Sequence, residues 1–160
     1  MSRTLKNVLF VIIVAMVLCI LGFIREFVFE NINAQLYTLW YDYKDYSLPA
    51  SLAFFNSWTA NELYYLKFPL TVLSGLAYFL VAIFTVRRFF PGKKFRNITF
   101  VVHVFVFALA GVFFLYGLAF DDYDHGYQFS RIFMDFLQSP LLLMILLPGF
   151  VLIREEKSSL

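Results

Sequence analysis

Four stretches of about twenty apolar residues constrain this chain more than any other feature. A helix of about 20 apolar residues crosses the hydrocarbon core of a bilayer, and windows of that kind lie at 5–24, 68–86, 98–120 and 132–153. Of all 160 residues, 61% are apolar and only 15% are charged. A soluble domain of this size needs more charge to cover its surface. The sequence therefore predicts an all-α polytopic membrane protein with four transmembrane helices, organised as a single domain over residues 1–160.

The uneven placement of charge predicts the orientation of these helices. With the N-terminus inside, nine of the 13 basic residues fall on the inner side, namely Arg3, Lys6, Arg87, Arg88, Lys93, Lys94, Arg96, Arg154 and Lys157. Nine of the 11 acidic residues then fall on the outer side, namely Glu26, Glu30, Asp42, Asp45, Glu62, Asp121, Asp122, Asp124 and Asp135. Short cytoplasmic loops are enriched in Lys and Arg. We therefore expect both termini in the cytoplasm.

The connection between the second and third windows is short and basic. Its five cations are Arg87, Arg88, Lys93, Lys94 and Arg96. Cations beside a membrane span favour anionic headgroups of the inner leaflet. We expect the bilayer to be their partner and expect no nucleic-acid partner.

The outer segment 25–59 is the one long connection, and it is rich in aromatic residues. Helical spacing of Ile32, Leu36, Leu39 and Tyr43 predicts a short helix lying at the membrane interface. The segment is expected to cover headgroups, cap the bundle or meet a partner. Its candidate partner-docking residues are Trp40, Tyr41 and Trp58.

A capping box predicts that the second helix starts before its apolar window. Thr59 can accept a hydrogen bond from the Glu62 backbone N–H while the Glu62 side chain reaches back to Thr59. Pro69 in that helix and Pro140 in the fourth lack a backbone donor, so both predict kinks.

Small residues mark the faces through which membrane helices pack. Those predicted to face the bundle are Ala15, Cys19, Gly22, Gly75, His103, Ala110 and Gly117. His103 is ionisable and lies within a predicted span, where such residues are functional candidates. We favour a structural role for it, as a neutral ring bonded to a neighbouring helix. Cys19 is the chain's single cysteine, so an intramolecular disulfide is excluded.

A polar strip opens the fourth window. Arg131 and Asp135 are four residues apart and can pair on one helix face, and Gln138, Ser139 and Pro140 follow. The strip is a candidate for docking a partner or locking the bundle, and local helix stabilisation explains it equally well.

The densest polar cluster is the predicted outer turn that holds Asp121, Asp122, Asp124 and His125. Carboxylates and an imidazole can hold a divalent cation, but the spacing matches no EF-hand or zinc signature. A solvated acidic turn is the simpler explanation. The chain carries no nucleophile elbow, His-x-x-x-His pair or phosphate loop, so we predict no catalytic residue and no cofactor.

Residues 130–148, which read SRIFMDFLQSPLLLMILLP, resemble the C-terminal pattern of small membrane proteins associated with bacterial exosortase systems. The dipeptide Leu48-Pro49 and the run LKFPLT at 66–71 are also similar in order to segments of those proteins. That pattern has Gln-x-Pro or Gln-Pro, and this chain has Gln-Ser-Pro rather than a plain Gln-Pro. The resemblance implies about four spans, no peptidase activity of its own, and an exosortase-like cysteine transpeptidase as partner in a bacterial inner membrane.

Three functions fit these observations. The first is a non-catalytic accessory subunit of an inner-membrane complex, bound to a larger integral membrane protein that sorts or exports surface proteins. The second is a small transporter or channel subunit, with proline-broken helices around a midplane site. The third is a metal-assisted enzyme that acts at the outer leaflet through residues 121–125.

The predicted orientation can be tested with single cysteines in a Cys19→Ser background. We expect a membrane-impermeant thiol reagent, added outside cells, to label His125→Cys and to miss Lys94→Cys until the membrane is opened. The opposite labelling pattern would invert the topology.

Overall fold

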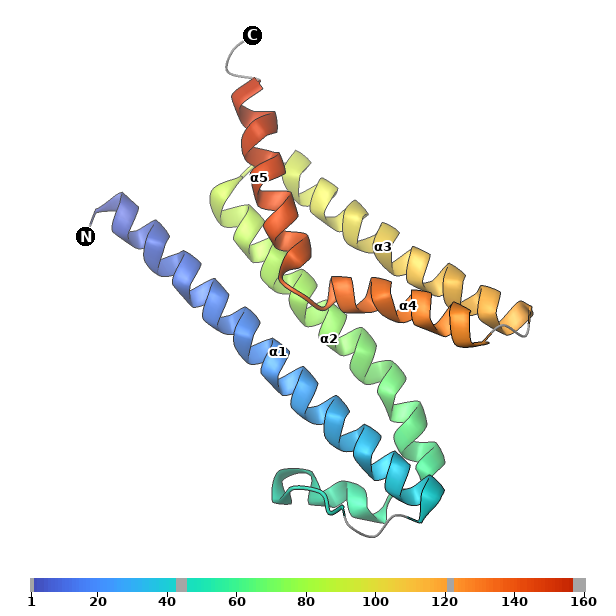
Figure 1. Cartoon of the computed structure of the whole chain (residues 1–160). Helices are drawn as coiled ribbons and strands as arrows, with labels where there is room; N and C mark the ends of the chain where they lie inside the picture. The colour runs from blue at the N-terminus through green and yellow to red at the C-terminus, as the bar shows by residue number, and fades with distance from the viewer. Residues whose placement is uncertain (1, 43–45, 121–122, 157–160) are drawn as a thin grey trace. The chain divides into compact units, whose positions relative to one another are not determined.

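The computed structural model is all-helical and describes residues 2–42, 46–120 and 123–156 (Figure 1). In chain order its elements are α1 (Arg3–Tyr41), the short 3-10 helix η1 (Ala50–Ser57), α2 (Ala60–Phe89), α3 (Lys93–Ala119), α4 (Tyr123–Leu137) and α5 (Leu141–Glu156). Helices α1, α2 and α3 are long and apolar enough to cross a membrane, and the bent pair α4–α5 is the fourth candidate span. The predicted all-α membrane fold is confirmed.

Residues in the fourth apolar window form two helices rather than one kinked helix. The chain bends by 57° between α4 and α5. Pro140 lacks a backbone donor and disfavours helical backbone at Ser139, so α4 stops before them. The Ser139 hydroxyl occupies the break: it donates to the Phe136 carbonyl (2.8 Å) and accepts from the Leu141 N–H (3.3 Å). The break is thus hydrogen-bonded from within the chain.

Helix α1 is much longer than its apolar window. Its 39 residues correspond to about 58 Å, and it ends where Asp42 takes a positive φ of 50°, a backbone region that Asp tolerates better than most residues. Ile32 and Leu36 therefore belong to α1, which corrects the expectation of a separate helix through them. The short helix predicted within 25–59 is present as η1, further along the segment.

The start of α2 follows the predicted capping box. The Glu62 carboxylate accepts the Thr59 backbone N–H (2.7 Å) and hydroxyl (2.8 Å), and the Thr59 hydroxyl accepts the Glu62 N–H (3.4 Å). The helix begins at Ala60 and continues without interruption through Pro69.

The chain divides into two compact units, each with its own apolar core. The larger unit comprises residues 1–18 and 75–160, and its core consists of Ala82, Val86, Phe90, Val106, Leu137, Leu142, Leu143, Leu146 and Phe150. The smaller unit comprises residues 19–74, and its core consists of Ile32, Leu36, Leu48, Leu52, Phe55 and Leu63. A single domain over 1–160 stays a prediction.

Helix α4 packs antiparallel along α3 within the larger unit (Figure 1). Gly126 lies so close to α3 that a β-carbon there would stand 2.8 Å from the Phe113 carbonyl oxygen and closer still to the Gly117 Cα. Further along, the Phe113 ring stacks on Phe129 (5.3 Å) and Phe133 (5.5 Å). Two facing glycines therefore set the distance between these helices.

Replacing Gly126 by alanine should push α4 away from α3. We expect Gly126→Ala to lower the free energy of unfolding by about 1–3 kcal/mol, the usual cost of overpacking, measured by denaturant titration in detergent. Gly111→Ala is the matched control, because nothing lies within 4 Å of a β-carbon at that position. The control should be neutral or slightly stabilising. Equal stability of the two variants would contradict the close packing.

Candidate functional site

Helix α4 packs along α3, and α5 meets the other end of α3 through the Phe150 ring. At one end Gly126 meets Gly117, and at the other the Phe150 ring packs against Phe95 (5.1 Å) and Phe90 (5.5 Å). The break between the two helices therefore lies at an intermediate level along α3. The bent pair α4–α5 is thus the fourth candidate span, interrupted at this break.

The N-terminal end of α1 lies beside the C-terminal end of α2. Arg88 donates to the Asn7 side chain (3.2 Å), and the Phe10 and Phe89 rings are 5.6 Å apart. Phe150 of α5 reaches the same α2–α3 turn. At this end Arg87, Arg88, Lys93 and Lys94 are exposed and Arg96 is half-buried. Their predicted contact with anionic headgroups stays a prediction.

Helix α4 has one polar and one apolar face. Asp124, Gln128, Arg131 and Asp135 follow one another at spacings of four, three and four residues, which places them on one side of a helix. The face that meets α3 is formed by Gly126, Phe129, Phe133 and Leu137. Helix α4 is therefore amphipathic, with its polar face turned away from α3.

The sequence predicted the Arg131–Asp135 pair at the outer start of the fourth helix. In the structure the pair lies inside α4. The helix begins at Tyr123, eight residues before Arg131. The Arg131 Nε and Asp135 Oδ2 atoms are 3.6 Å apart, and the two side chains are 68% and 44% exposed. An ion pair this exposed contributes little to stability in water. The position of the pair along α4 matters more than its contribution to stability.

The remaining residues of the predicted polar strip have different surroundings. Gln138 is 3% exposed, and its Cγ lies 4.0 Å from the position of a β-carbon on Gly75. Ser139 hydrogen-bonds within the break, whereas Pro140 is exposed. Gln138 and Ser139 therefore serve the chain's own structure.

The predicted docking aromatics also differ in exposure. Trp40 and Tyr41, at the end of α1, are 56% and 69% exposed, and the Trp40 ring lies 6.2 Å from Tyr64. Trp58 is half-buried, with its ring edge-on to Phe55 at 5.0 Å. Trp40 and Tyr41 are thus mostly exposed, whereas Trp58 packs against the core of the smaller unit.

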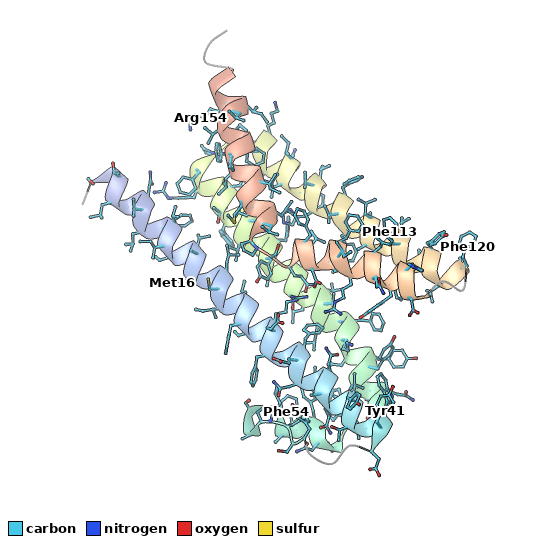
Figure 2. All side chains as sticks on the ribbon, viewed as in Figure 1. Met16, Tyr41, Phe54, Phe113, Phe120 and Arg154 are labelled. Carbon is cyan, nitrogen blue, oxygen red and sulfur yellow. The ribbon has the colours of Figure 1, made fainter. Side chains whose placement is uncertain are left out.

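Most of the small residues predicted to pack are buried or half-buried, but two are not. In α3, His103, Ala110 and Gly117 are buried. Gly22 and Gly75 are half-buried, whereas Ala15 and Cys19 are exposed (Figure 2 labels their neighbour Met16).

His103 hydrogen-bonds within its own helix. Its Nδ1 lies 2.7 Å from the Thr99 carbonyl oxygen, whereas the sequence suggested a bond to a neighbouring helix. The Phe79 ring of α2 packs edge-on against it at 5.1 Å. These contacts suit the structural role favoured for His103.

The predicted metal cluster is only partly within the described residues. Asp121 and Asp122 lie outside them, and Asp124 and His125 are exposed in the first turn of α4. Among the described residues, no group of three or more His, Cys, Asp or Glu side chains is arranged to hold a metal ion. The four-residue site stays a prediction.

The smaller unit contains a hydrogen-bonded pair of polar side chains that the sequence did not predict. The Tyr46 hydroxyl donates to the Asn31 Oδ1 (2.6 Å), and the Asn31 amide donates to the Phe27 carbonyl (2.6 Å). Burial raises the pKa of the Tyr46 phenol, and the nearby Glu30 carboxylate raises it further. The two partners are 15 residues apart and share no recognisable motif, so no local signal could have paired them.

No protein-family model, curated protein or solved structure matches this chain.

Removing the Tyr46 hydroxyl should weaken the smaller unit. We expect Tyr46→Phe to lower the free energy of unfolding by about 1 kcal/mol, because the Asn31 side chain loses its donor. Tyr41→Phe is the control, since Tyr41 is mostly exposed. The difference in the free energy of unfolding between the two variants should persist at every pH below the ordinary tyrosine pKa. It should vanish as pH rises through the raised pKa of Tyr46, where the phenol loses its proton. Identical unfolding curves at neutral pH would exclude a contribution from this bond.

Proposed function

We propose that this small polytopic membrane protein is a non-catalytic accessory subunit of a larger complex in a bacterial inner membrane. The observation that carries the proposal is the exposure of α1. Only 6% of its most apolar window is buried, against 22% in each of α2 and α3. A span that packs so little within its own chain has most of its surface available to a partner helix.

Exposed small residues on α1 support this role. Apolar side chains gain little by leaving lipid for protein, so helices associate in membranes where small residues let their backbones approach. Ala15 and Cys19 are four residues apart, share one face of α1 and are exposed. In the smaller unit, the exposed Trp40 and Tyr41 rings are further candidates for contact with a partner.

The resemblance of residues 130–148 to exosortase-associated membrane proteins supports a particular partner class. The partner would be an exosortase-like cysteine transpeptidase that sorts or exports surface proteins. The chain carries no nucleophile–base motif of its own, which supports a positioning role for it rather than a chemical one.

The broken fourth crossing favours a second candidate, a small transporter or channel subunit. Interrupted helices line the binding sites of many transporters, and α4–α5 bends by 57° at its break. Solute flux into liposomes that contain only the purified chain would favour this alternative. A metal-assisted enzyme acting through residues 121–125 is less favoured, and loss of an activity in Asp122→Asn and His125→Ala would be needed to support it.

The accessory role predicts that a tagged chain, extracted from native membranes in mild detergent, brings down a larger integral membrane protein in constant ratio. Ala15→Leu should lower that yield about tenfold, equivalent to about 1.4 kcal/mol, because the added volume holds the partner helix away. Met16→Leu is the matched control, since Met16 is also exposed and the exchange conserves volume. Recovery of the chain alone, or equal yields from both variants, would contradict the proposal.

A further inference from the structure

Much of the polar face of α4 lies beside the interior of α3 and not beside the C-terminal end of α3. The Phe129 and Phe133 rings, on either side of Arg131 in the sequence, both stack on Phe113 (labelled in Figure 2). Phe113 is six residues inside the end of α3 at Ala119. At 1.5 Å per residue, the level of Arg131 is about 9 Å below that end. Asp135 lies about one turn of α4 further along.

Lipid tails are a poor environment for these side chains. The side chains of Arg131 and Asp135 are 68% and 44% exposed. Helix α3 is a candidate membrane span, and charged groups beside a span within the hydrocarbon core are costly, so they face protein or a water-filled space. On α3, at the same level, Val112 is 60% exposed and apolar, as expected for a lipid-facing surface. One level of the larger unit thus presents a charged surface on α4 and an apolar one on α3.

We infer that water enters the membrane along the polar face of α4, from the surface at which α3 ends down to the Arg131–Asp135 pair. Below the pair, Gln138 is buried and the core side chains Leu142, Leu143, Leu146 and Phe150 close the larger unit. The hydrated face therefore ends at the break between α4 and α5. It admits water and small hydrophilic solutes through about half of the crossing, while α5 keeps the other half sealed.

Substituted cysteines in proteoliposomes of the purified full-length chain test this inference. In a Cys19→Ser background, Arg131→Cys and Gln128→Cys report the polar face, and Val112→Cys is the control of matched depth and exposure. We expect a charged, membrane-impermeant methanethiosulfonate reagent to modify positions 131 and 128 at least about ten times faster than position 112. That ratio corresponds to a difference of about 1.4 kcal/mol in access. Protection of 128 and 131 equal to that of 112 would overturn the inference.

A depth measurement separates a hydrated membrane-embedded face from a helix that lies on the surface. A fluorophore attached at Val112→Cys should be quenched most by lipids brominated near the middle of the acyl chain. Strongest quenching near the headgroups would place Arg131 at the interface and overturn the inference. Each variant is first checked for monodisperse elution and unchanged helix content. If Arg131→Cys fails that check, Gln128→Cys decides the outcome. The partner is absent from these vesicles, so the result is independent of the proposed accessory role.

Discussion

The close approach of Gly126 to Gly117 determines much of the arrangement of the larger unit. With no β-carbon at either position, α4 lies directly on the backbone of α3 and has little freedom to slide or rotate. The stacking of Phe113 on two rings of α4 then fixes how the two helices align. The direction of the polar face, the position of Arg131 along α3 and the level of the break all follow from this contact.

The break at 138–140 gives the bent pair α4–α5 two unlike halves. Pro140 ends the helical hydrogen-bonding pattern, and Ser139 supplies a donor and an acceptor that the exposed backbone groups require. Non-helical backbone at membrane depth is tolerated where such partners exist. Because of this break, α4 carries charge on one side while α5 contributes four of its apolar side chains to the core.

The two candidate functions place different physical demands on the same molecule. An accessory subunit needs a span that its own chain leaves uncovered, and α1 meets that demand through its exposed apolar window and small residues. A transporter needs a polar route through the full thickness of the membrane. In the larger unit the polar face of α4 ends where the apolar core begins, so that face alone does not form such a route.

The sequence by itself determined the fold class, the approximate positions of the apolar spans and the capping box at Thr59 and Glu62. These features depend on local composition and on neighbours in the chain. Only the tertiary structure decided that α4 begins at Tyr123, that α1 continues to Tyr41 and that Asn31 pairs with Tyr46. The early turns of α4 are too polar to form an apolar window, although their polar and apolar residues have helical spacing. Only the contact of Gly126 with Gly117 shows that they pack on α3, because packing depends on which atoms come together and not on the average polarity of a window.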